Sequence, residues 1–142
     1  VLGHLADDEI ANTHRLRRML AEDGPELSVW DEHAFIDSSL YSGERPTRSG
    51  TPVGGCVAVI YTLRMFNSDL LASLDDGQWA RRGLHPEHGE ITIRSLAETA
   101  TWHLERHAWF VNAKIQHMLG DEACETPAPE ACGSNCGCHP SP

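Results

Sequence analysis

The sequence lacks three features that would assign its class at once. It has 11 Lys and Arg residues against 21 Asp and Glu residues, which argues against a nucleic-acid surface built from clustered cations. Its longest apolar run, Cys56 to Leu63 with one Thr included, is far shorter than the ~20 residues of a membrane span. The N-terminus, which reaches Asp-Asp-Glu by residue 9, has neither the basic nor the apolar region of a signal peptide. We therefore expect a cytoplasmic protein that binds neither nucleic acid nor a membrane.

Cysteine is nearly absent from the body of the chain. Four of the five cysteines lie within the last 19 residues, and the fifth, Cys56, lies inside the apolar run. A fold stapled by disulfides is therefore not expected. Free cysteine is among the most buried residue types, so Cys56 is predicted to be a small core residue.

Hydrophobic periodicity predicts an all-α protein with three long helices. They cover about residues 1–22, Pro52 to Leu74 and Thr92 to Leu119, with a short helix around Trp30 to Leu40. Asp7, Asp8 and Glu9 suit the positive end of the first helix dipole. The segment 75–90 is a connector. Two regions follow: a helical domain over 1–119, and a tail over 120–142 whose lack of Lys, Arg and aromatic residues predicts flexibility.

The third long helix carries two histidines on its apolar face. Its inward stripe is Leu96, Ala100, His103, His107, Phe110 and Lys114, and its outward residues are Arg94, Glu98, Thr101, Glu105 and Asn112. Two imidazoles four residues apart can hold one divalent ion. The alternative is a pair of hydrogen-bonded core histidines. His4, on the first helix, offers a third ligand from a neighbouring helix.

Two motifs resemble the DinB/YfiT-like superfamily. Val1-Leu-Gly-His-Leu-Ala-Asp7 resembles its second-helix motif, and Leu84-His-Pro-Glu-His-Gly-Glu-Ile-Thr-Ile93 with Ala100-Thr-Trp-His-Leu-Glu-Arg-His107 resembles its connector and last-helix H-x-x-x-H. The resemblance covers about residues 1–119. It implies an up-down-down-up four-helix bundle that binds a divalent ion (Zn, Ni or Mn) through His4, His103 and His107. Because this chain begins at the second-helix motif, the first helix of the family is not expected in it.

The resemblance also implies an activity. Several members of the family are thiol S-transferases that use bacillithiol or mycothiol, and others are described as metal-dependent hydrolases. We therefore expect a small-molecule substrate and prefer thiol S-transfer, with hydrolysis as the alternative. A third possibility is a non-catalytic metal-handling protein, and a fourth is an inactive family member. An apolar core face left without its first helix predicts a homodimer.

The remaining histidines divide into two groups. His85 and His88 lie in the connector and are candidates for a role beside the metal, or else for turn and helix-entry chemistry. His14, His33 and His117 show no partner pattern and are expected at the surface. Three tryptophans are predicted to be packing residues: Trp79, Trp102 and Trp109.

The tail contains a second set of metal-binding residue types. Cys132, Cys136, Cys138 and His139 form C-x3-C-x-C-H, which could wrap a soft ion such as Zn or Cu(I). Cys124 stands apart from this cluster. The alternative is an unstructured tail with free thiols, and the family resemblance does not extend to it.

Overall fold

The computed structural model describes residues 1–38, 40–41 and 53–119. Its three long helices are α1 (Leu2–Ala21), α3 (Val53–Ala72) and α5 (Ile93–Leu119). Each of them begins and ends within two residues of the bounds predicted from periodicity. The short helix expected around Trp30 is α2 (Glu32–Asp37). Pro52, predicted to open the second long helix, and the tail over 120–142 lie outside the described residues.

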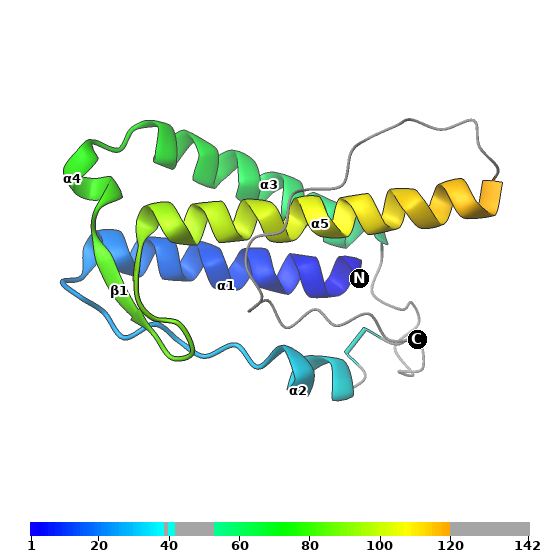
Figure 1. Ribbon diagram of the computed structural model, residues 1–142, viewed down its shortest axis with the longest axis horizontal. Coiled ribbons are helices and arrows are strands. Elements are labelled where there is room, and N and C mark those ends of the chain that lie inside the picture. The colour runs from blue at the N-terminus through cyan, green and yellow to red at the C-terminus, as the bar shows by residue number, and fades with distance from the viewer. Residues whose placement is uncertain (39, 42–52, 120–142) are drawn as a thin grey trace. The chain divides into compact units, whose positions relative to one another are not determined.

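The chain forms two compact units, residues 1–100 and a second that begins at Thr101, so α5 contributes to both. Within the first unit, α1 and α3 lie side by side and run in the same direction, and α5 begins in the opposite direction (Figure 1). Two parallel neighbours cannot be joined by a tight turn, so a long connection separates α1 from α3. A buried hydrogen bond of 2.7 Å from Asn67 Nδ2 to Thr13 Oγ1 ties these two helices together.

One hydrophobic cluster holds the first unit together. Met19 and Ile93 are fully buried, and with them pack Leu16, Leu27 and Leu96. Trp79 packs against this cluster, as predicted. Cys56 is buried, which confirms its assignment as a core residue. The core therefore joins α1 to the beginning of α5, the two helices that carry the predicted metal ligands.

The connector contains structure that periodicity did not predict. After the four-residue helix α4 (Asp76–Trp79), the strands β1 (Arg82–His85) and β2 (Gly89–Thr92) pair in an antiparallel hairpin, with Arg82 opposite Thr92. Gly89 has φ +69°, which glycine adopts without steric cost. Gly83 lets the backbone of β1 approach the Met19 side chain, because a Cβ at this position would lie 3.0 Å from Met19 Cγ. The all-α class is confirmed for the long elements, and the hairpin is an addition to it.

Among the described residues, no helix combines the length and the apolar character needed to cross a bilayer.

Candidate metal centre

His103 and His107 lie one turn apart on α5, and their rings meet. Nε2 of His107 is 3.0 Å from Nε2 of His103, and the two rings pack edge to face. Metal–imidazole bonds are ~2.0–2.1 Å long, so one ion can reach two nitrogens at this separation. The two rings are neighbours, as the four-residue spacing predicts, and their binding of an ion stays a prediction. Most of the predicted stripe is buried or half-buried, but Lys114 is exposed and Asn112, placed on the outward face, is half-buried.

His4 is positioned by the first turns of α1 and by the segment that follows that helix. Its side chain is buried, and the indole of Trp30 stacks on its imidazole with 5.3 Å between ring centroids. Nε2 of His4 lies 3.5 Å from Oε1 of Glu32. Gly3 leaves room for the ring of Tyr41, whose hydroxyl donates a 2.7 Å hydrogen bond to Asp7 Oδ2. Burial and the hydrogen bond raise the pKa of Tyr41 above its ordinary value.

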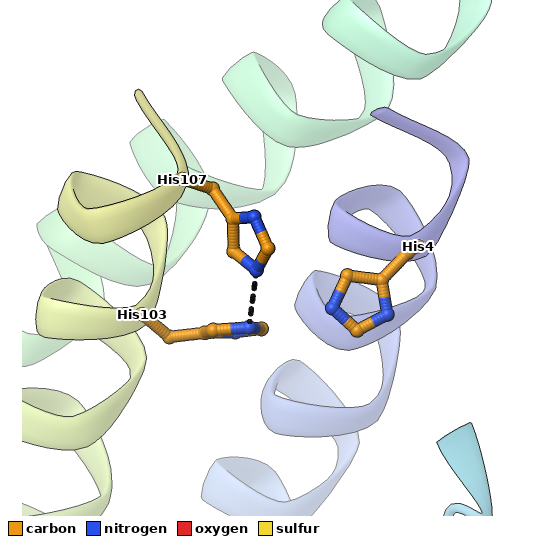
Figure 2. Close-up of side chains that lie close together, drawn as sticks. All are labelled: His4, His103 and His107. Atoms are coloured by element: carbon orange, nitrogen blue, oxygen red, sulfur yellow. Dashed lines mark hydrogen bonds between the residues drawn. The ribbon is translucent and has the colours of Figure 1, made fainter. Parts of the chain in front are cut away.

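His4, His103 and His107 form a group that could hold a metal ion. Each offers one ring nitrogen, and these three atoms all lie within 4.8 Å of one another (Figure 2). Neutral imidazole nitrogens are preferred ligands of Zn, Ni and related divalent ions, so the donor set fits the expected cofactor. Trp30 and Glu32 were not identified from the sequence, because no spacing or periodicity links that segment to His4.

The prediction that the acidic residues near the start of α1 compensate the helix dipole is wrong. The first turn of α1 contains no acidic residue, and the dipole effect fades beyond the first turn. Asp7 instead accepts the Tyr41 hydroxyl, and Asp8 is buried. Glu9 is buried and pairs with Arg64 of α3 at 2.5 Å. These carboxylates therefore serve tertiary packing.

His85 and His88 belong to the hairpin turn. Nδ1 of His85 accepts hydrogen bonds from the backbone N–H groups of Glu87 and His88, at 3.2 and 3.4 Å, and the two imidazoles stack. These contacts favour the turn interpretation over a role at the metal. Burial, followed by the nearby Arg15 guanidinium, lowers the pKa of His85 to about 4. His85 is therefore neutral at neutral pH.

The lowered pKa of His85 predicts a pH-dependent stability. The unfolded chain takes up a proton near pH 6.5, and the folded chain does so only near pH 4, so the free energy of unfolding falls as pH drops through this window. The loss is at most about 3 kcal/mol. His85→Asn keeps an acceptor near the position of Nδ1 and does not titrate, so urea unfolding at pH 7 and pH 4.5 should show a smaller difference for the variant. An equal difference in both proteins would contradict the assignment.

The other predicted residues are placed as follows. His14, His33 and His117 are exposed, as expected. Trp102 and Trp109 are half-buried; the guanidinium of Arg106 lies over the Trp102 ring, and Trp109 packs edge to face with Phe110. The tail cluster (Cys132, Cys136, Cys138 and His139) and Cys124 lie outside the described residues.

The chain is similar to proteins described as metal-dependent hydrolases. No protein-family model matches it. The Putative metal-dependent hydrolase YfiT of Bacillus subtilis is 29% identical over 119 residues, which are 83% of this chain and 63% of that protein. A second protein called a putative metal-dependent hydrolase, from Oceanobacillus iheyensis, is 26% identical over 107 residues, which are 75% of this chain and 58% of that one.

A solved structure has the same fold. YfiT from Bacillus subtilis, described as a probable metal-dependent hydrolase with an unusual four-helix bundle topology, matches with a TM-score of 0.70 at 24% identity, over 82% of this chain and 63% of that chain. This chain thus spans less than two thirds of the length of these relatives. The resemblance to the DinB/YfiT-like superfamily and its four-helix-bundle fold is confirmed.

Proposed function

We propose that this chain, a homologue of YfiT-like metal-dependent hydrolases, binds one divalent ion through His4, His103 and His107 and is itself a metal-dependent enzyme. The observation that carries the proposal is the gathering of three imidazole nitrogens within 4.8 Å. Three neutral ligands leave the charge of a bound ion uncompensated and leave a coordination position for water or substrate, as in catalytic rather than structural sites. The ion is Zn, Ni or Mn.

The chemistry follows from that open position. A divalent ion bound there lowers the pKa of an adjacent water or thiol. Hydrolysis is supported by the names of the two relatives. Transfer of a low-molecular-weight thiol rests on the superfamily resemblance and is the second candidate. In both, the chain's own contribution is to position the three imidazoles, with Trp30 covering one face of the His4 ring.

Metal content tests where the ion binds. The full-length protein equilibrated with Zn²⁺ is expected to retain one ion per chain, measured by atomic emission after gel filtration. The variant with Cys132, Cys136 and Cys138 all changed to Ser should retain the same ion, because the three histidines hold it. If the Ser variant loses the ion and His103→Ala keeps it, binding belongs to the tail, and the metal-handling alternative replaces this proposal.

Two assays separate the candidate reactions. A hydrolase should release nitrophenol from small nitrophenyl esters without any thiol, and a transferase should consume bacillithiol or mycothiol together with monochlorobimane. Either rate must disappear when the metal is removed by a chelator and return when it is restored. Metal binding without either activity would favour the non-catalytic protein.

The homodimer and the cytoplasmic location stay predictions. The exposed face of α3 supports a partner, because Val53, Val57, Tyr61 and Met65 recur every four residues and are between 48 and 67% exposed. Apolar stripes of this kind often mark an interaction surface. The division into a domain over 1–119 and a tail over 120–142 also stays a prediction.

A further inference from the structure

The segment that follows α1 brings two side chains to one metal ligand. Trp30 stacks on the face of the His4 imidazole, and Oε1 of Glu32 lies 3.5 Å from its Nε2 atom. Phe35 packs edge to face against Trp30, which fixes the indole. Glu32 opens α2 directly after Asp31, whose carboxylate accepts the backbone N–H of Ala34 at 3.0 Å. The backbone that carries Glu32 is therefore held by a helix cap.

The separation between Glu32 and His4 is longer than a direct charge-assisted hydrogen bond. Charge-assisted hydrogen bonds between nitrogen and carboxylate are ~2.7–2.9 Å long, and this separation is 3.5 Å. Among the described residues, the compact group of ligand atoms consists of the three histidines and leaves the Glu32 carboxylate outside it. Glu32 thus lies beside a ligand nitrogen without belonging to the ligand set.

The indole of Trp30 presents a second polar group beside His4. The Nε1–H group of Trp30 is buried and has no hydrogen-bond partner among the described residues. A buried donor left unsatisfied costs free energy, and such groups in folded proteins commonly bind a water or a ligand. Beside His4 the chain therefore presents a carboxylate acceptor and an unsatisfied donor.

We propose that the Glu32 carboxylate accepts a hydrogen bond from the molecule that occupies the open position beside His4. Glu32 would orient a water or a thiol there by accepting a hydrogen bond from its O–H or S–H group. The negative charge of Glu32 would repel an anion that carries no hydrogen. The inference rests on the proposed metal site and names a further residue of it. It applies equally to hydrolysis and to thiol transfer.

Two probes of opposite chemistry test this role in protein loaded with Co²⁺. Acetohydroxamic acid transfers its O–H proton to a neighbouring acceptor when it binds a divalent ion and keeps an N–H donor, whereas azide carries no hydrogen. Each is titrated into wild type and Glu32→Gln while the visible absorption of the Co²⁺ is recorded. We expect Glu32→Gln to bind acetohydroxamic acid about 10-fold more weakly, since a hydrogen bond to a charged acceptor is lost. We expect azide to bind more tightly in the variant, since a negative charge is removed.

Control variants keep the test specific. Asp37→Asn changes the other carboxylate of α2, which is exposed, and should leave both probe affinities unchanged. Glu32→Asp keeps the charge and should lie between wild type and Glu32→Gln for both probes. Circular dichroism checks that each variant is folded.

The two probe affinities decide whether Glu32 accepts a hydrogen bond from the bound molecule. Opposite shifts of the two probes support Glu32 as the hydrogen-bond acceptor. Unchanged affinities, or shifts in the same direction, overturn this role and reduce Glu32 to a structural residue. Wild-type protein that fails to hold Co²⁺ contradicts the three-histidine site itself, which is a separate failure.

Discussion

His107→Ala is expected to lower the affinity for the divalent ion by about 100- to 1,000-fold. Binding free energies of zinc in small protein sites are ~10–16 kcal/mol, so one of a few ligands contributes roughly 3 to 4 kcal/mol, and each 1.4 kcal/mol is a factor of ten. Nε2 of His107 lies 3.0 Å from Nε2 of His103, so its loss leaves the α5 half of the site with one nitrogen. Competition with a chromophoric chelator measures the affinity.

A matched histidine on the same helix provides the control. His117 is exposed in the last turn of α5, and His117→Ala should bind the ion like the wild type. Any metal-dependent activity should fall with His103→Ala and with His107→Ala by similar factors, and the double variant should lose little more, because ligands act as a unit. Undiminished affinity of His107→Ala would show that the ion is held elsewhere.

The second large effect concerns the partly buried ion pair between α1 and α3. Arg64→Met is expected to lower the free energy of unfolding by about 3 kcal/mol, because it removes the cation that contacts the buried Glu9 carboxylate. Glu9 is buried, and the Arg64 guanidinium contacts its Oε1 atom at 2.5 Å and donates to the carbonyl oxygen of Ala100 at 2.6 Å. Urea unfolding at pH 7 provides the measurement.

A surface arginine and a double variant complete that experiment. Arg17 is exposed and lies over the Phe66 ring, so Arg17→Met should cost less than about 1 kcal/mol. Glu9→Gln combined with Arg64→Met should cost less than the sum of the single changes, because the two residues interact. Additive effects would mean that the pair is not coupled.

Periodicity predicted α1 and α5 because α1 and the beginning of α5 bury apolar residues in one core. Leu16 and Met19 of α1 lie three residues apart and are both buried, and Leu96 of α5, which belongs to the predicted inward stripe, is buried as well. The pairing of His103 with His107 needed no tertiary information, since residues four apart on a helix are neighbours. The surface positions of His14, His33 and His117 were likewise predictable.

Three features could not be read from local patterns. The hairpin over 82–92 has strands of four residues each, too short for a clear alternation. Glu9 resembled a dipole-compensating residue, and only its contact with Arg64, 55 residues away, shows its role. Trp30 and Glu32 reach His4 because the chain folds back after α1, which no spacing in the sequence encodes.

The sequence by itself determined the long helices, the excess of acidic over basic residues, and the two histidines that share a face of α5. These properties depend on backbone periodicity and on composition, and both are local. Only the tertiary structure showed that ring nitrogens of His4, His103 and His107 lie within 4.8 Å of one another, that His85 accepts hydrogen bonds in a turn, and that Glu32 lies beside His4. The physical reason is that a metal site needs nitrogen atoms within a few ångströms of one another. Such distances between residues far apart in the chain are set by how the helices pack.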